Sequence, residues 1–410
     1  MRILYLSQFF LPEIAAGTSR AYGLAREWTR AGHEVTVLTF FPHYPKGEAY
    51  PGFEYGNRLF KEETIEGIRV LRAFNLFYRP HQLWKRAADL PLGAFTSALT
   101  GLLDSQKHDV VIATSPQPLL FFSALAIGKL HGIPTVLEIR DHWPEAISGS
   151  SLLIRAAVPP AKRLIKEAYR QANLVVGVSP FYREVFRSYG VPDDKMAIFE
   201  NGLDEGEFPL NVESHWKEEL GLTNRFVVSF VGTIGRNMGL ETVLESARDL
   251  ANTNAHFLFV GHGARREPLE QRAQEMGLKN ITFHPPVERD KLAGIYKASD
   301  VSLACLANHP FHKPRIPAKL WEILGMGIPM ILCAPNGAAK AVAVNQAGGA
   351  LWVPPEDSKA LTTAIRTLMN NPTQRKELGT KGQTFVRNGF TRAQIARRYA
   401  ERLKALVKQA

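Results

Sequence analysis

The 410-residue sequence contains only two cysteines, Cys305 and Cys333, and each lies inside an apolar run. So little cysteine favours two reduced core thiols over a disulfide framework, as is usual in a cytoplasmic protein. Met1 to Leu6 shows none of the charged, apolar and small-residue zones of a secretory signal. The longest apolar stretch, Pro118 to Gly128, is shorter than the roughly 17–25 residues that a membrane-spanning helix needs. We expect a cytoplasmic protein, either soluble or held peripherally on the inner face of the plasma membrane.

Motifs that would assign other functions are also missing. No G-x-G-x-x-G sequence follows the first apolar run, so the sequence lacks a dinucleotide-binding fingerprint. No Asp-x-Asp pair occurs, so a metal ion that bridges phosphate groups is not indicated. Zinc-finger spacing and the aromatic signature of RNA-binding domains are absent, and we expect no nucleic-acid partner.

Positive charge is in excess, with a formal net charge of +11 that is unevenly distributed. Residues 371–410 contain ten Lys and Arg against two Glu, and Arg155 to Arg187 contains seven against two. Such stretches suit either an anionic membrane surface or a solvated helix face, and both interpretations stay open. Trp84, Lys85 and Arg86 add an aromatic ring and two cations to the membrane interpretation.

Short β-branched runs alternate with helical segments along the chain, which predicts parallel sheets with crossover helices. The pattern begins at Arg2 to Leu6 and restarts at Phe226 to Val231. We therefore predict an α/β protein of two facing, Rossmann-like, doubly wound domains with a central cleft at the carboxyl ends of their strands. The expected bounds are 1–200 for the N-terminal domain, 201–224 for a linker, 225–385 for the C-terminal domain, and 386–410 for a helix that crosses back to the N-terminal domain.

Two helices near the end of the chain have clear signals. Asp357 is expected to cap a helix from Ser358 to Met369. After Thr391, apolar residues recur at helical spacing and predict an amphipathic helix. They are Ile395, Tyr399, Leu403 and Leu406.

Two glycine-rich turns follow the first two strands of the second domain. Between them they contain Gly232, Thr233, Gly235, Arg236, Gly261 and Gly263. Glycine lets a backbone approach a ligand closely, and an arginine clasps phosphate oxygens. Two such turns at one sheet edge predict a nucleotide site.

Two further segments suit a nucleotide diphosphate. The loop from Ser7 to Gly17 leads from the first strand into a helix, where backbone N–H groups attract phosphate. Lys319 and Glu322 are three residues apart and share a helical face. The ammonium suits the diphosphate, and the carboxylate suits a pair of ribose or sugar hydroxyls. A plain connection and a surface ion pair are the alternatives.

In order and spacing these segments resemble family 4 of the retaining glycosyltransferases, which have the GT-B fold. The resemblance covers nearly all of the chain. Its motifs are Phe10-Leu11-Pro12-Glu13 with Gly17, residues 32–39, Asn201-Gly202-Leu203-Asp204, Phe230-Val231-Gly232, residues 259–263, Pro317 to Pro329, and residues 354–357.

Two segments, Pro42 to Gly47 and Arg140 to Pro144, resemble the branch that builds O-antigen and capsule repeat units. That branch often transfers N-acetylated or deoxygenated hexosamines to polyprenyl diphosphate. The resemblance implies that Gly17, Arg236, Lys319 and Glu322 bind the donor, in addition to the other turn residues named above. Arg140 and Asp141 are expected near the reacting sugar and acceptor, where they and Lys319 would be catalytic. On the acceptor side we expect Glu13, His43 and Trp143.

The sequence departs from the family pattern at three places. The usual glycine pair is Ala16-Gly17 here, and Pro314 stands where many members have a glutamate eight residues before Glu322. Of the usual Arg-x5-Lys phosphate pair only Arg236 is present, so Lys319 is expected to substitute. The identity of the donor sugar is left open by these changes.

The resemblance implies a hexosyltransferase-type enzyme that needs no metal or other cofactor. Its expected partners are a nucleotide-sugar donor, a polyprenyl-diphosphate-linked or other glycan acceptor, and an anionic membrane surface. Two alternatives remain: a non-hydrolysing nucleotide-sugar epimerase, which needs no acceptor, and a non-catalytic nucleotide or glycan sensor.

Overall fold

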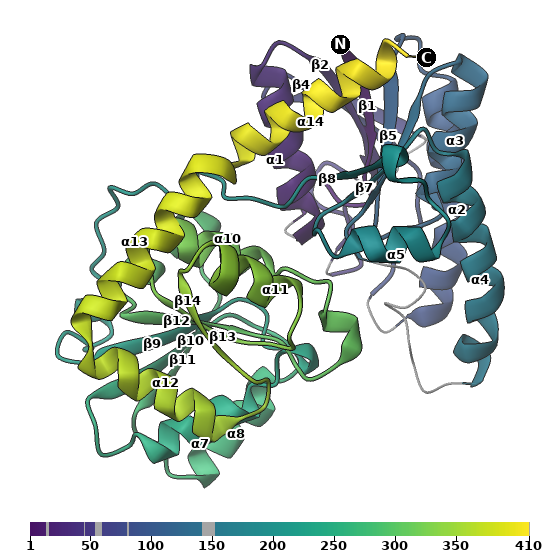
Figure 1. Cartoon of the computed structure of the whole chain (residues 1–410). Helices are drawn as coiled ribbons and strands as arrows, with labels where there is room; N and C mark the ends of the chain where they lie inside the picture. Colours follow the sequence, from purple (N-terminus) through teal and green to yellow (C-terminus); the bar gives the residue numbers. More distant parts are fainter. Residues whose placement is uncertain (14–15, 45, 54–59, 80–81, 142–151, 410) are drawn as a thin grey trace. The chain divides into compact units, whose positions relative to one another are not determined.

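The computed structural model describes residues 1–410 except 14–15, 45, 54–59, 80–81, 142–151 and 410. It divides into two compact units (Figure 1). The first consists of Met1–Glu200 together with Arg392–Ala410, and the second of Asn201–Thr391. Residues 201–224, expected as a linker, are thus part of the second unit and contain the short helix α6 (Trp216–Glu219).

The first unit is built on an eight-stranded sheet with the order β3-β4-β2-β1-β5-β6-β7-β8. Every neighbouring pair is parallel except β3 and β4. The strands are β1 (Arg2–Leu6), β2 (Glu34–Phe40), β3 (Phe60–Ile65), β4 (Ile68–Ala73), β5 (Val110–Thr114), β6 (Thr135–Ile139), β7 (Leu174–Gly177) and β8 (Met196–Ile198). Its helices are α1 (Ala16–Arg30), α2 (Leu83–Leu102), α3 (Leu120–His131), α4 (Leu152–Gln171), α5 (Tyr182–Ser188) and α14 (Arg392–Val407).

Helices cover both faces of this sheet (Figure 1). One layer contains α1 and α14, which pack on each other, and the other contains α2, α3 and α4. Trp28 of α1 donates from its indole Nε1 to the carbonyl of Ala396 at 2.9 Å. The four residues predicted to share one face of the last helix are all buried, which confirms that amphipathic pattern.

The β3–β4 hairpin was not predicted from the sequence. β3 lies at the sheet edge, and its residues alternate between exposed and partly buried positions. Glu66 and Gly67 turn the chain with φ of 49° and 79°, which suits a tight hairpin connection. An edge strand keeps one face in solvent, so it lacks the continuous apolar run that marked the buried strands.

The second unit is built on a six-stranded parallel sheet with the order β11-β10-β9-β12-β13-β14. The strands are β9 (Phe226–Val231), β10 (Ala255–Val260), β11 (Ile281–His284), β12 (Val301–Cys305), β13 (Met330–Cys333) and β14 (Ala350–Val353). Its remaining helices are α7 (Glu241–Asp249), α8 (Arg266–Glu275), α9 (Leu292–Lys297), α10 (Ala318–Gly325), α11 (Ala338–Lys340), α12 (Ser358–Asn370) and α13 (Pro372–Gly389).

Local signals in this unit agree with the structure. The Asp357 side chain accepts from the Ala360 N–H at 2.8 Å and begins α12, as predicted. Cys305 and Cys333 are register partners on β12 and β13, and both are buried free thiols. Among the helices of the described residues, none has the length and apolarity to cross a membrane.

Candidate functional site

Two glycine turns of the second unit lie side by side at the carboxyl ends of β9 and β10. Gly232 has φ of 122°, and Gly261 and Gly263 both have φ of 148°. A Cβ on Gly261 would collide with the Gly232 carbonyl, and one on Gly263 with the Ile234 carbonyl. Only glycine fits these positions, because the backbones of the two turns touch.

The turn after β9 is fixed by backbone hydrogen bonds. The Ile234 N–H donates to His262 O at 2.8 Å, and the Ala307 N–H donates to Asn237 O at 2.9 Å. Thr233 and Arg236 are exposed on this turn, and Gly235 precedes the short 3₁₀ helix that Arg236 begins. The turn therefore presents an exposed guanidinium on a backbone fixed by hydrogen bonds.

Lys319, in the first turn of α10, reaches the same sheet edge. Its Nζ lies 3.6 Å from the centroid of the Phe230 ring. A Cβ on Gly232 would stand 3.2 Å from that nitrogen, so the missing side chain leaves the ammonium room. The buried Nζ has no hydrogen-bond partner among the residues that the structure describes. Burial lowers the pKa of Lys319 to about 8, against the weaker opposite effects of Cys305 and Glu322.

An unpartnered buried ammonium is costly unless a ligand completes it. A diphosphate oxygen at the mouth of the Gly232 turn would supply the missing partner. The arrangement suits an anion-binding position, built from residues that the sequence had singled out.

Glu322, one helical turn beyond Lys319, is oriented by two residues that the sequence did not single out. It accepts from the Tyr296 hydroxyl at 3.1 Å and from Arg289 Nη2 at 3.5 Å. Arg289 also pairs with Glu207 at 2.5 Å. Burial, with Glu322 beside it, raises the pKa of Tyr296 well above its usual value, so this hydroxyl remains a donor. Nothing in the sequence spacing would have found Arg289 and Tyr296, which lie just before and within helix α9.

In the first unit, the structure brings Arg140 and Gly17 together. A Cβ on Gly17 would stand 3.2 Å from Arg140 Nη1, so the guanidinium lies directly over this glycine. The N–H groups of Arg140 and Asp141 donate to Ser115 Oγ at 2.9 and 3.2 Å. The buried Arg140 Nε has no partner in the described part of the chain. Burial lowers the pKa of Arg140, and the positive charge of Arg20 lowers it further.

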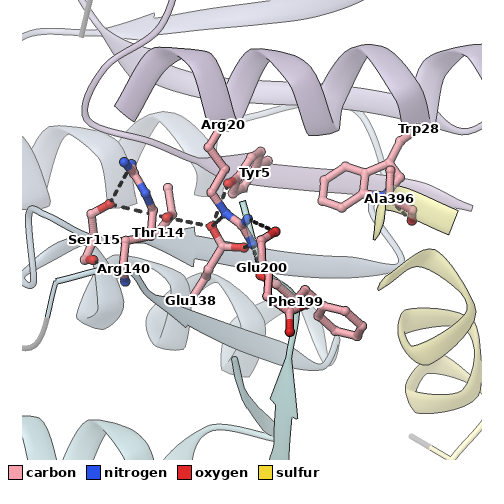
Figure 2. A network of polar contacts seen from close by, with 10 residues as sticks. All are labelled: Tyr5, Arg20, Trp28, Thr114, Ser115, Glu138, Arg140, Phe199, Glu200 and Ala396. Carbon is pink, nitrogen blue, oxygen red and sulfur yellow. Dashed lines mark hydrogen bonds and ion pairs between the residues drawn. The ribbon is translucent and has the colours of Figure 1, made fainter. Parts of the chain in front are cut away.

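Beside Arg140 lies a buried ion pair between helix α1 and strand β6 (Figure 2). Glu138 of β6 accepts from Arg20 of α1 through Nε at 3.0 Å and Nη2 at 2.8 Å. The Arg20 side chain is 2% exposed and the Glu138 side chain 0%. Tyr5 and Thr114 also donate to Glu138 Oε1, at 3.0 and 2.8 Å.

The same guanidinium holds the end of the first unit. Arg20 donates to the carbonyl of Glu200 at 2.8 Å and to that of Phe199 at 2.9 Å. Figure 2 shows Arg140 and Ser115 beside this network. Arg20 and Glu138 were not candidates in the sequence, although an acid within the buried run Thr135–Ile139 was a usable signal.

Glu13 and His43, expected on the acceptor side, also meet. Glu13 Oε1 accepts from the backbone N–H groups of His43 at 3.0 Å and Tyr44 at 2.9 Å. The His43 ring stacks on Phe77. Burial raises the pKa of Glu13 to about 7, against the two backbone hydrogen bonds that lower it. Trp143, the third acceptor-side residue, lies outside the described residues.

The Glu13 pKa leads to a test of stability against pH. The folded protein holds this proton more tightly than the unfolded chain, whose glutamate titrates at 4.5. Its contribution to stability is therefore full below pH 4.5 and is lost as the pH rises through about 7. Glu13→Gln stays neutral and keeps an oxygen for both N–H groups. We expect it to raise the free energy of unfolding by about 2 kcal/mol at pH 8 and to change it little at pH 4.5.

Urea unfolding at both pH values measures this effect. Glu48→Gln is the matched control, because Glu48 is 65% exposed in its pair with Arg79 and should have little effect at either pH. An equal change at both pH values for Glu13→Gln would show that the buried carboxyl is not the cause.

Comparisons with known proteins identify the family of this chain. The profile of the glycosyl transferase 4-like domain matches residues 16–202, and that of the glycosyl transferases group 1 matches residues 212–385. The chain belongs to family 4 of the glycosyltransferases. A putative colanic acid biosynthesis glycosyl transferase of Escherichia coli K12 is 29% identical over 389 residues, which cover 91% of this chain and 93% of the relative. The O-antigen chain mannosyltransferase C of Escherichia coli is 22% identical and covers 95% of both chains.

Solved structures confirm the fold of this glycosyltransferase. Sucrose-phosphate synthase from Thermosynechococcus elongatus matches with a TM-score of 0.78 and 18% identity, over 100% of both chains. The Anabaena protein HepE in complex with UDP matches with a TM-score of 0.73 and 16% identity, over 99% of this chain and 100% of that one. The predicted GT-B fold of two Rossmann-like domains is therefore confirmed. The role of each site residue stays a prediction.

Proposed function

We propose that this glycosyltransferase moves a hexosyl group from a nucleotide diphosphate sugar to a lipid-linked glycan acceptor, with retention of anomeric configuration. The buried Lys319 ammonium beside Gly232, which has no hydrogen-bond partner among the described residues, is the observation that carries the proposal. It provides a positive charge where a diphosphate leaving group needs one. The relatives named for colanic acid and O-antigen biosynthesis support a role in surface polysaccharide assembly.

The proposed reaction breaks the bond between the anomeric carbon and the diphosphate oxygen. Negative charge then grows on the phosphate, where the N–H groups after β9, Arg236 and Lys319 would stabilise it. The acceptor hydroxyl attacks the same face of the sugar and gives its proton to the departing phosphate. Retention follows from this front-face attack.

The first unit would serve the reacting sugar and the acceptor. The Arg140 guanidinium over Gly17 is proposed to bind near the leaving group, and Asp141 to orient the acceptor hydroxyl. Asp141 is half-buried, and Ser115 holds its backbone in place. Glu13 and His43 are proposed to shape the acceptor side.

The donor is proposed to be an N-acetylhexosamine nucleotide or a deoxygenated derivative of one. The UDP in a solved relative makes UDP-sugars the first choice. We also propose that no metal is needed, since Lys319, Arg236 and backbone N–H groups supply the positive charge. Excess EDTA is then expected to leave the initial rate unchanged.

A thermal-shift screen tests the donor, with UDP, GDP, GDP-mannose and UDP-N-acetylhexosamines. We expect UDP and one UDP-sugar to raise the melting temperature, because a ligand that binds the folded state stabilises it. Transfer of the radiolabelled sugar to extracted polyprenyl diphosphate lipid, with NMR assignment of the product anomer, tests the reaction. A product with inverted anomeric configuration would rule out the front-face mechanism.

The alternatives give different results in the same assays. Isomerised donor without any acceptor would establish an epimerase. Nucleotide binding with no turnover of any donor in the panel would establish a sensor.

A further inference from the structure

Helix α2 of the first unit turns several large apolar side chains outward. Its buried positions recur every four residues and carry small or polar groups. They are Asp89, Gly93, Ser97 and Gly101. The outward side chains include Trp84 at 70% exposure, Phe95 at 67% and Leu99 at 43%, and Leu103, just after the helix, is 73% exposed. We name these last four residues the α2 face.

Tight packing on the inner side prevents α2 from turning these residues inward. A Cβ on Gly93 would stand 2.8 Å from Phe40 Cζ, and one on Gly101 would stand 2.5 Å from Ile127 Cδ1. The helix backbone thus rests against β2 and α3, where a Phe or Leu side chain has no space. Exposure of the α2 face is therefore a consequence of the packing, and water is a poor solvent for such a surface.

The charges around the α2 face are positive. Lys85 and Arg86 lie in the first turn of α2, and Lys85 Nζ is 5.7 Å from the centroid of the Trp84 ring. The only acid within the helix is Asp89, which is 2% exposed and accepts from the Leu76 N–H at 2.7 Å. The outward side of α2 thus presents apolar groups with cations at one end.

The neighbouring helix α4 adds further positive charge to the same layer. Both α2 and α4 pack on α3, on one face of the sheet (Figure 1). α4 exposes Lys162, Arg163 and Lys166, and Leu164 is 54% exposed among them. A second copy of this chain would bring the same cations into contact, whereas anionic lipid would bring opposite charge.

We propose that the α2 face lies in the headgroup region of an anionic bilayer, with Lys85 and Arg86 on lipid phosphates. This inference rests on the proposed function, since a lipid-linked acceptor is reached from that surface. A helix with an apolar side and flanking cations binds such an interface through buried apolar area and attraction to anionic lipid.

Vesicle flotation with the full chain tests the docking surface. The vesicles are phosphatidylcholine with and without phosphatidylglycerol, and no sugar donor is present. We expect the parent to float with phosphatidylglycerol and the variant Phe95→Ser/Leu99→Ser/Leu103→Ser to bind at least about tenfold more weakly. Lys85→Glu/Arg86→Glu should weaken binding by at least about tenfold at low salt, and less at high salt.

Matched controls distinguish binding through the α2 face from nonspecific hydrophobic or electrostatic binding to vesicles. Phe60→Ser removes a ring of 59% exposure from the edge strand β3. Lys404→Glu/Lys408→Glu makes the same charge change at the end of α14 and just after it, on the other face of the sheet. Both controls should float like the parent. All variants change exposed or partly exposed side chains and should keep the parent melting temperature.

Three outcomes would overturn the proposal. In the first, the triple serine variant floats like the parent. In the second, the parent does not float. In the third, the parent is a dimer that does not bind vesicles, and the serine variant is a monomer. The last would assign the face to a second copy of the chain. Failure of the proposed function is distinct, because the flotation assay does not depend on donor or acceptor.

Discussion

Replacing Lys319 by methionine is expected to weaken UDP binding at least about tenfold and to lower kcat at least about tenfold, because a charge-assisted contact to phosphate is lost. Methionine keeps the unbranched stem that packs on Phe230. The free energy of unfolding should not fall, since the variant removes a buried ammonium that has no partner in the described part of the chain. Calorimetric titration with UDP, initial rates and urea unfolding measure the three quantities.

Lys340→Met is the matched control for Lys319. Lys340 Nζ lies 3.7 Å from the centroid of the Trp352 ring in the same unit, so it makes the same kind of cation–π contact. We expect UDP affinity to stay within about twofold of the parent for this variant. If both lysine variants bound UDP like the parent, Lys319 would have no role at the phosphate.

The pH dependence of UDP binding gives a second readout of the same lysine. In the unliganded protein the Lys319 pKa is about 8, so the side chain is mainly charged below pH 8 and mainly neutral above it. Phosphate favours the charged form, so the UDP dissociation constant should rise as the pH passes through about 8. In Lys319→Met this rise should disappear.

The second large effect is expected on stability, from the buried pair of Arg20 and Glu138. Glu138→Gln should lower the free energy of unfolding by about 3–5 kcal/mol, because it leaves a buried guanidinium without its counter-charge. The double variant Arg20→Met/Glu138→Gln should recover a large part of this loss, since both buried charges are then gone. Urea unfolding of the parent, the two single variants and the double variant provides the cycle.

An exposed pair is the control for this cycle. Arg170 and Glu167 form an ion pair on α4 with side-chain exposures of 71% and 44%, and Glu167→Gln should change the free energy of unfolding little. A loss of the same small size for Glu138→Gln would show that solvent, and not Arg20, compensates the carboxylate.

Loss of the Arg20–Glu138 pair should affect two segments of the first unit. Arg20 holds the carbonyls of Phe199 and Glu200, and Glu138 lies two residues before Arg140. A variant of either residue should therefore disturb the segment that carries Arg140 as well as the last residues before the second unit.

Residues whose role is local were found from the sequence. The Asp357 cap and the apolar face of α14 depend on neighbours within a few positions. The glycines at the ends of β9 and β10 were also singled out from the sequence, although the structure shows that they are required where the two turns touch. Lys319 and Glu322 were singled out by their spacing on a helix, and their role stays a prediction.

Residues whose role depends on distant partners were not found. Arg289 and Tyr296 orient Glu322 from 33 and 26 positions away, and Arg20 meets Glu138 across 118 positions. Single-sequence patterns contain no information on such pairs, because their distance in space is set by the order of strands in the sheet.

By itself the sequence determined the class of the protein: two α/β units with glycine turns and cations suited to a nucleotide diphosphate. The periodicity of strands and helices is enough for that conclusion, together with glycines at turns where other residues would not fit. Only the folded structure shows that the Lys319 ammonium is buried with no hydrogen-bond partner among the described residues, that Arg140 lies over Gly17, and that α2 turns several large apolar side chains outward. Burial and the approach of distant side chains depend on how helices pack on the sheets, which no local pattern specifies.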